Sequence, residues 1–476
     1  MERALLKAHI PFLMASLLVG CSKPVEYDLA VENVSVIDIT TGEVLPGRHL
    51  GILDGSIEYI GSDPVQAESY LSGSGRWAIP GLWDMHVHIS DPSFFPLFIA
   101  NGIVGVRDMG GAAPAATNGC ESINYETLRS WQTDIRTGVL SGPDIVAAGP
   151  VVSGTGANSS LDATSPQKAR DAVSQVVAMG VDFVKVYEDI SLETLRAIAS
   201  EAETQGVHFA GHVSEETLRT IDAVESGQRS IEHVRANLLL CFADTDEQLQ
   251  ELFVSDQWDA DDRQWAARHL ETCPELWKKF RSSDIWLTPT LAIQETLETA
   301  TEEGFEHDPR RDSLPESIRQ SVESLSQSLR ERSSSESAEV KNWNRYIHKL
   351  VGRAIREDVS LLAGSDSACE GTIPGYSLHR ELELLVEAGS SSLGALQAAT
   401  LNPARYLQRE SSSGRLDVGF EADIVLLDGN PLDDISNTQL VYAVIIDGGV
   451  EFLSSESDQA LSLITDKGDA RPNEGS

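Results

Sequence analysis

The sequence feature that most constrains the fold is a long middle region in which apolar segments alternate with helical segments. Eight segments have the length and composition of buried strands: 81–88, 103–108, 144–152, 181–187, 207–212, 230–234, 285–291 and 359–366. Helical periodicity lies between most of them, for example at 165–179 and 191–204. Eight strands that alternate with helices predict an α/β fold of the (β/α)8 TIM-barrel type, over residues 79–414.

Both ends of the chain have a different pattern. Short alternating runs separated by Gly and Asp fill residues 27–78, and similar runs return at 422–452. This alternation is typical of antiparallel strands joined by tight turns. We therefore predict a small β-sandwich domain built from both chain ends, residues 21–78 and 415–453.

Two long, charged, serine-rich stretches interrupt the predicted barrel, at 241–280 and 298–349. The second contains Ile318, Val322 and Leu329 at helical spacing, so we expect helical insertions. Such insertions are either solvated surface helices or a lid over the active site, since barrel insertions lie in the loops after the strands. The last residues, 454–476, have the composition of a disordered tail.

The N-terminus has the features of a targeting signal. Arg3 and Lys7 precede ten mostly apolar residues, 10–19, a stretch too short for an ordinary spanning helix. Small residues then lead to Cys21, as at the cleavage site of bacterial lipoproteins. We predict that residues 1–20 form a signal peptide and that Cys21 is lipidated. Ser22 favours anchoring in the outer membrane, facing the periplasm of a Gram-negative bacterium, because an Asp there would be typical of inner-membrane retention.

Charge and cysteine content exclude several classes of protein. The chain has 36 basic and 74 acidic residues, a net charge of −38, which argues against nucleic-acid binding and against adsorption of the folded domain to anionic lipid. We expect membrane contact only through the lipid on Cys21. Hydrophobic residues make up 41%, enough for a substantial core. The five cysteines contain no C-x-x-C pair, so a cysteine zinc site or a dense disulfide framework is not expected. An oligomer is compatible with the sequence.

The motif Asp84-Met85-His86-Val87-His88 ends the first predicted barrel strand. Residues i and i+2 of a strand point to the same side, so His86 and His88 converge at the barrel mouth. Two imidazoles placed in this way are suited to bind a divalent metal.

Three further ligand candidates end later strands. His212 closes the segment VHFAGH, His233 closes SIEH and Asp366 closes LLAGSD. Active sites of barrels lie at the C-terminal ends of their strands. These three residues therefore extend the predicted metal site.

Lys185 lies between apolar residues near the end of the fourth predicted strand. Burial of its ammonium is costly and lowers the pKa, and a neutral amine can react with carbon dioxide to form a carbamate. An anionic carbamate can bridge two metals. The alternative is an ordinary salt bridge to Asp182 or Glu188.

Two other residues have open assignments. Tyr187 lies on the same strand face as Lys185, and its phenol either binds a substrate carbonyl or carboxylate or packs in the protein. Arg107, next to Asp108 at the end of the second strand, is assigned to an internal ion pair rather than to substrate binding.

The segments IPGLWDMHVH, DFVKVY, GHV, SIEH, AGSD, AATLNPARYL and ADIVLLDGNPL together resemble the amidohydrolase superfamily, and most closely its imidazolonepropionase-like and prolidase-like hydrolases. The resemblance covers residues 27 to 452, and the insertions are its least similar part. It implies a binuclear site, typically with zinc. His86, His88 and Asp366 would bind one ion, His212 and His233 the other, and a carboxylated Lys185 would bridge both.

The resemblance also implies a reaction. The expected enzyme hydrolyses an amide C–N bond in a small molecule, such as a dipeptide or an N-acyl amino acid, by a metal-activated hydroxide with Asp366 as the proton carrier. A cyclic amidase or a deaminase of the same superfamily is the first alternative, and deaminases typically lack the bridging lysine. A non-catalytic lipoprotein that binds a metal or a ligand is the alternative from another class.

Overall fold

The computed structural model describes residues 26–110, 123–155, 160–214, 217–234, 274–331 and 334–454. The predicted signal peptide, Cys21, the tail after Ser454 and most of the insertion 241–280 lie outside the described residues. Within the described stretches, no helix is both long enough and apolar enough to cross a membrane.

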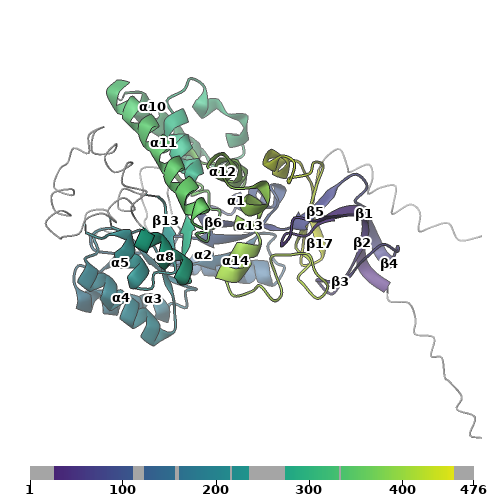
Figure 1. Ribbon diagram of the computed structural model, residues 1–476, viewed down its shortest axis with the longest axis horizontal. Coiled ribbons are helices and arrows are strands. Elements are labelled where there is room, and N and C mark those ends of the chain that lie inside the picture. Colours follow the sequence, from purple (N-terminus) through teal and green to yellow (C-terminus); the bar gives the residue numbers. More distant parts are fainter. Residues whose placement is uncertain are drawn as a thin grey trace, which may run out of the picture.

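Both ends of the chain contribute to one sheet, at the right of Figure 1. Its strands, in pairing order, are β17 (Gly449–Leu453), β16 (Val441–Ile446), β15 (Ile424–Leu427), β5 (Trp77–Pro80), β1 (Glu26–Ile37), β2 (Val44–Leu53) and β3 (Ser56–Gly61). β4 (Gln66–Ser72) pairs with β1 outside this path. Segments from opposite ends of the sequence thus lie next to each other, since β15 pairs with β5.

Strand β1 pairs with a different parallel strand along each half of its length. Its first half pairs with β4, and its second half pairs with β5. A register shift around Asn33, whose φ is 56°, separates the two halves and keeps the apolar residues of both on one side. Those residues are buried in an apolar cluster with residues of β2, β15 and β16. This cluster is distinct from the larger core around the parallel strands.

The middle of the chain forms parallel strands. One sheet contains β6 (Leu82–Val87), β7 (Ile103–Asp108) and β8 (Asp144–Ala147). A second contains, in pairing order, β10 (Leu161–Asp162), β9 (Val152–Ser153), β11 (Val184–Val186), β12 (Phe209–Gly211), β13 (Ser230–Glu232) and β14 (Trp286–Thr288). Every residue of β6 and β7 is buried, as expected for parallel strands covered by helices.

The segment 359–366 was predicted as the eighth strand, but it forms only isolated bridges. The Leu287 N–H donates to the Ser360 carbonyl oxygen at 2.9 Å, and the Met85 N–H donates to that of Ala363 at 2.9 Å. Through these two hydrogen bonds the segment 359–366 connects β14 with β6. Gly364 packs closely against His86, since a Cβ at Gly364 would lie 2.7 Å from the Cβ of His86.

Helices cover the parallel strands. They are α1 (Phe94–Ala100), α2 (Tyr125–Arg136), α3 (Pro166–Ala178), α4 (Leu192–Gln205), α5 (Thr220–Glu225), α8 (Pro274–Ser282), α12 (Tyr376–Glu387), α13 (Ser392–Ala398) and α14 (Leu401–Tyr406). The starts of α3 and α4 follow the sequence pattern, since the hydroxyls of Ser165 and Ser191 accept hydrogen bonds from backbone N–H groups of the first turn. The described residues therefore form a mixed α/β fold.

The described part of the second insertion is helical. The end of α9 (Leu291–Thr299) leads into it, and it contains the short 3-10 helices η3 (Phe305–His307) and η4 (Pro309–Arg311), α10 (Glu316–Arg330) and most of α11 (Ser334–Arg356). Helices α10 and α11 lie at the top of Figure 1. The apolar stripe of α10 is buried at Ile318, Val322 and Leu329. Arg311 donates a hydrogen bond to the carbonyl oxygen of Gly371 at 2.8 Å, so the insertion packs on the loop that follows Asp366. A lid function of this insertion stays a prediction.

Candidate metal and active site

The six predicted metal ligands lie at or just after the ends of parallel segments. They are His86 and His88 around the end of β6, Lys185 in β11, His212 after β12, His233 after β13 and Asp366 at the end of 359–366. Five of these side chains are buried, and that of His88 is 15% exposed. Among the six candidates, His88 is therefore the side chain nearest to solvent.

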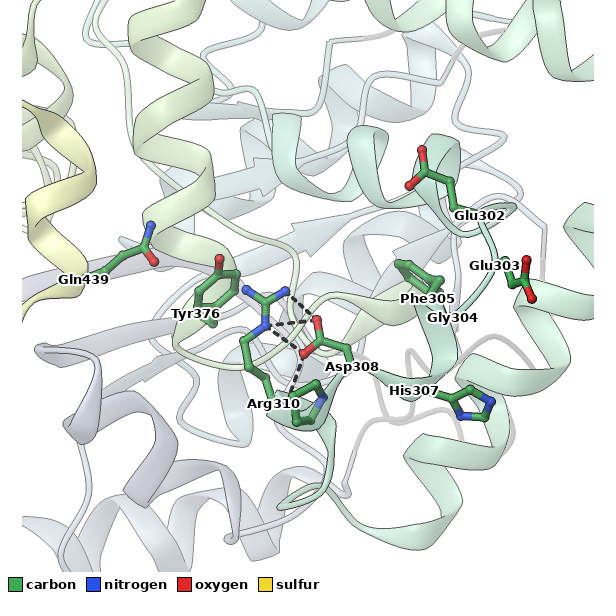
Figure 2. Close-up of a pocket in the computed structure, with 10 residues that line it drawn as sticks. Glu302, Glu303, Gly304, Phe305, His307, Asp308, Arg310, Tyr376 and Gln439 are labelled. Carbon is green, nitrogen blue, oxygen red and sulfur yellow. Dashed lines mark hydrogen bonds and ion pairs between the residues drawn. The ribbon is translucent and has the colours of Figure 1, made fainter.

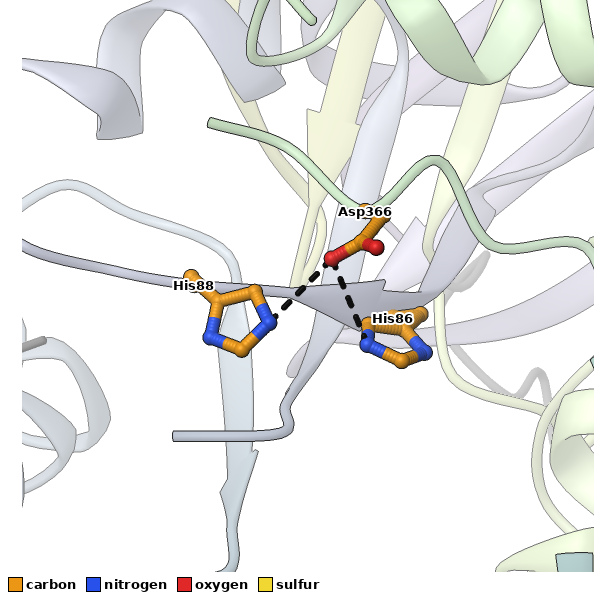
Figure 3. A group of neighbouring side chains, drawn as sticks. All are labelled: His86, His88 and Asp366. Carbon is orange, nitrogen blue, oxygen red and sulfur yellow. Dashed lines mark ion pairs between the residues drawn. The ribbon is translucent and has the colours of Figure 1, made fainter. Parts of the chain in front are cut away.

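His86, His88 and Asp366 form one group (Figure 3). Their ligand atoms all lie within 4.8 Å of one another. The Oδ1 atom of Asp366 is 3.1 Å from Nε2 of His88 and 3.4 Å from Nε2 of His86. Two imidazole nitrogens and a carboxylate oxygen thus face a common point.

His212 and His233 form a second group beside the first. Their Nε2 atoms lie 3.0 Å apart. The other carboxylate oxygen of Asp366, Oδ2, is 3.9 Å from Nε2 of His233. Asp366 therefore lies between the two groups, with one oxygen directed at each.

Hydrogen bonds at Nδ1 fix the tautomers of three of these histidines. The Nδ1 atom of His86 is 3.0 Å from the Glu232 carboxylate, and that of His212 is 2.7 Å from the Glu188 carboxylate. A carboxylate accepts only, so both Nδ1 atoms must donate. The hydroxyl of Thr290 donates to the Pro289 carbonyl oxygen at 2.8 Å and lies 2.6 Å from Nδ1 of His233, so this hydroxyl accepts the His233 proton.

Each of these imidazoles consequently directs an Nε2 lone pair into the site. The lone pairs of His212 and His233 face each other across 3.0 Å, which is repulsive unless a cation shares them. Within the described part of the chain, Nε2 of His86 and Oδ1 of Asp366 are buried and form no hydrogen bond. Nitrogen and carboxylate donors of this kind match the ligand preference of zinc and similar divalent ions. The residues present therefore fit a metal site.

The electrostatics support deprotonated ligands. Burial lowers the pKa of His86, which keeps its imidazole neutral. Burial alone would raise the pKa of Asp366, but the imidazoles of His86, His88 and His233 bring it well below its ordinary value. Burial thus favours the neutral imidazole of His86, and the surrounding histidines favour the charged carboxylate of Asp366, and these are the forms that bind metals.

Lys185 lies inside the protein beside this site. Its side chain is 1% exposed, and its charge acts on His86, Glu232 and Asp108. Gly211 of the neighbouring strand leaves room for it, since a Cβ there would lie 3.0 Å from Cδ of Lys185. The carboxylate of Asp182, one of the expected salt-bridge partners, accepts a hydrogen bond from the Ala147 N–H at 2.8 Å.

Tyr187 lies at the rim of the site. Its ring centroid is 4.3 Å from that of His212, and the residue is 41% exposed. Tyr187 is therefore not packed in the protein core. Its phenol, next to the candidate ligand His212, is accessible to a substrate.

Sequence reasoning missed Glu232 as the partner of Arg107. Both side chains are fully buried, and Nη2 of Arg107 lies 2.9 Å from the Glu232 carboxylate. Arg107 also donates to the carbonyl oxygen of Met85, to Ser230 and to Thr288, so it connects β7 with β6, β13 and β14. The predicted internal ion pair exists, and its acid is Glu232. A charged residue inside the short buried strand SIEH was the available signal.

The Glu232 carboxylate stays ionised at the centre of this network. Burial by itself would raise its pKa, but Arg107 and His86 lower it well below the ordinary value. The positive charge of Arg107 thus offsets the free-energy cost of burying the Glu232 carboxylate, which accepts the hydrogen bond of His86.

Cys369 lies three residues after Asp366 and is disulfide-bonded. The other four cysteines all lie outside the described residues, and so does its partner.

A separate pocket of about 730 Å³ lies between the insertion and α12 (Figure 2). Arg310 occupies it, paired with Asp308 and stacked 3.7 Å from the ring centroid of Tyr376. Its lining residues are 302–305, 307–310, Tyr376 and Gln439, and none of them is a predicted site residue. We therefore assign this pocket no catalytic part.

Comparisons with known proteins agree with this geometry. Residues 347–450 match the family model described as the Amidohydrolase family. Ochratoxinase of Aspergillus niger is 23% identical over 462 residues, which cover 85% of this chain and 82% of the relative.

Two solved structures resemble the whole chain. A structure titled bottromycin amidohydrolase has a TM-score of 0.67 at 21% identity, and covers 92% of this chain and 90% of its own. A Xaa-Pro dipeptidase with bound methionine in the active site has a TM-score of 0.63 at 19% identity, and covers 90% of this chain and 100% of its own. At these identities the likeness shows the fold, which is of the TIM-barrel type.

We predict that Arg107→Met lowers the free energy of unfolding by about 3–5 kcal/mol, because it leaves the Glu232 carboxylate buried without its cation. Denaturant unfolding followed by circular dichroism measures this. Arg319→Met is the matched control, since Arg319 pairs with Glu316 at the surface, where such pairs contribute about 0–1 kcal/mol. Equal effects of the two substitutions would contradict the prediction.

Proposed function

We propose that the chain is a member of the amidohydrolase superfamily that hydrolyses C–N bonds, and that it cleaves an amide bond in a small molecule with two divalent metal ions. The observation that carries the proposal is the position of Asp366. Its two carboxylate oxygens face two groups of imidazole nitrogens, with Nε2 atoms at 3.1 Å and 3.4 Å on one side and at 3.9 Å on the other.

We propose that the parallel strands close into a full (β/α)8 barrel, with the segment 359–366 as its eighth member. Hydrogen bonds from Leu287 and Met85 to this segment support closure on one side. On the other side, the Asp182 N–H donates to the Ala147 carbonyl oxygen at 3.0 Å and links β8 to the start of β11. The strand ends then surround one site.

In this proposal His86, His88 and Asp366 would hold one ion and His212 and His233 would hold the other. Lys185 would be the ligand shared by both, as a carbamate formed by attack of its neutral amine on carbon dioxide with loss of a proton. When bound, two divalent ions lower the pKa of a water molecule and polarise a carbonyl group. Zinc is the proposed metal, because the donor set consists of imidazole nitrogen and carboxylate oxygen.

Asp366 carries the proton in the proposed reaction. Its carboxylate oxygens face both groups of imidazoles, where an attacking water would lie within reach for proton transfer. The water oxygen bonds to the amide carbon, the C–N bond breaks, and Asp366 returns the proton to the leaving nitrogen. One carboxylate therefore serves both proton transfers in sequence.

Tyr187 is proposed to bind the substrate. Its exposed ring stands next to His212, and its hydroxyl can donate a hydrogen bond to a substrate carbonyl or carboxylate. Dipeptides and N-acyl amino acids, which carry such groups beside an amide, are the proposed substrates. Among the similar proteins, the names dipeptidase and amidohydrolase agree with an amide of this kind.

We propose that the protein is anchored in the outer membrane by a lipid on Cys21 and faces the periplasm. The basic start, the short apolar stretch and the small residues before Cys21 support export. The disulfide at Cys369 supports it independently, since disulfides persist in oxidising compartments.

The substrate class is tested with the purified protein, supplied with zinc, on a panel of dipeptides, N-acyl amino acids, lactams, esters and aminopurines. We expect turnover of open-chain amides. Asp366→Asn should reduce it by about 10²–10⁴-fold, because the proton carrier is lost. Asp423→Asn, a carboxyl change in the sheet domain, is the control and should retain activity. Turnover of aminopurines alone, or full activity of Asp366→Asn, would refute the proposal.

Lys185→Ala tests the binuclear site. We expect its metal content per chain, measured by elemental analysis, to fall, and a short-chain carboxylic acid to restore part of it by filling the vacated bridge. Lys168→Ala removes an exposed lysine paired with Asp162 and should leave metal content unchanged. Full metal occupancy in Lys185→Ala would favour a mononuclear, deaminase-like site instead.

The anchor is tested by mass spectrometry of the mature protein from a bacterial envelope. We expect residues 1–20 to be absent and the new N-terminal Cys21 to carry acyl chains. A mature protein that begins at another residue, or an unmodified Cys21, would contradict the anchor without affecting the catalytic proposal.

A further inference from the structure

The start of helix α9 is tied to the metal site through Thr290. Thr290 is fully buried and has φ 50° and ψ 51°, a left-handed conformation that a β-branched residue rarely adopts. This conformation brings its hydroxyl to Nδ1 of His233, at 2.6 Å. The orientation of His233 therefore depends on how the chain turns into α9.

Thr290 cannot cap the helix that it precedes. A threonine at this position normally accepts a hydrogen bond from the first turn of its own helix, but here its hydroxyl is engaged with His233 and Pro289. The backbone N–H groups at the start of α9 must find another acceptor.

That acceptor is Glu381, from the distant helix α12. Its side chain is fully buried, and Oε2 accepts a hydrogen bond from the Ala292 N–H at 2.8 Å. The carboxyl group thus lies at the positive end of α9, where an acidic group is favourable. Its other oxygen, Oε1, forms no hydrogen bond with any described residue.

The surroundings of Glu381 make this placement costly for its charged form. Burial, together with the carboxylates of Asp84 and Glu295, raises the pKa of Glu381 to about 8, against the opposing effect of the Leu291 and Ala292 N–H groups. A leucine of similar size would avoid this cost. The position of a carboxyl group here therefore calls for a role beyond packing.

We propose that Glu381 is a positioning residue of the metal site: it holds the first turn of α9 so that Thr290 fixes His233 with Nε2 directed at His212. This inference rests on the proposed metal function. The hydrogen bond of a ligand histidine to a second residue commonly contributes 10–100-fold to metal affinity. Glu381 would act on that hydrogen bond through three intervening residues of the chain, 290–292.

The test measures zinc affinity of the full-length protein by competition with a chromophoric chelator, and the absorption spectrum of the cobalt-substituted protein. We expect Glu381→Leu to weaken zinc binding about 10-fold or more and to change the cobalt spectrum. Glu381→Gln keeps an acceptor for the Ala292 N–H and should restore both. Glu383→Leu, on the same helix, is the control for loss of a carboxylate from α12, and it should bind zinc like the parent.

A double-mutant cycle with Thr290→Val tests whether Glu381 acts on His233 through Thr290. If Glu381 acts through Thr290, the double variant should lose no more affinity than the weaker-binding single variant, whereas independent effects would multiply. Multiplying effects would overturn the inference, and so would parent-like affinity in Glu381→Leu. If Glu381→Leu does not fold, Glu381→Asp takes its place, because its shorter side chain withdraws the acceptor from Ala292. A parent protein that binds no zinc would instead overturn the proposed function itself.

Discussion

The buried ion pair between Arg107 and Glu232 is the interaction on which the rest of the site depends. An ionised Glu232 can only accept the hydrogen bond at Nδ1 of His86, and Arg107 beside it keeps this buried carboxylate ionised. Arg107 supplies the positive charge and donates its remaining hydrogen bonds to β6, β13 and β14. Its guanidinium group therefore joins these strands and, through Glu232, fixes the tautomer of the candidate ligand His86.

Three residues of the site have strained backbone conformations just after parallel segments end. His233, Thr290 and Asp366 have φ values of 68°, 50° and 58°, in the left-handed region that costs a non-glycine residue about 1–3 kcal/mol. Each of these residues bonds or faces another across the site. The left-handed turns redirect their side chains from the walls toward a common centre. Such strain persists because the surrounding hydrogen bonds over-determine the backbone, as those to Pro289 and His86 do here.

The sequence indicated the candidate ligands more readily than the residues that orient them. His86 and His88 could be identified because strand periodicity puts both on one side, and His212, His233 and Asp366 because each ends an apolar run. The segment 359–366 has the composition of a strand, but it forms single hydrogen bonds and an isolated bridge rather than a regular ladder, and Gly364 packs closely against His86. Local pattern carries no information about such contacts, which join residues far apart in the chain.

The acceptors of the Nδ1 protons could not be read from one segment alone. Glu188 and Thr290 follow strands that pair with the strand before their own histidine, whereas Glu232 belongs to β13, which does not pair with the β6 strand of His86. A hydrogen bond at Nδ1 orients an imidazole so that Nε2 can face a metal. For His212 and His233 a neighbouring strand provides the acceptor, and for His86 a strand of the other parallel sheet provides it. The arrangement of the strands in space, rather than the sequence around each histidine, therefore decides which residue orients each candidate ligand.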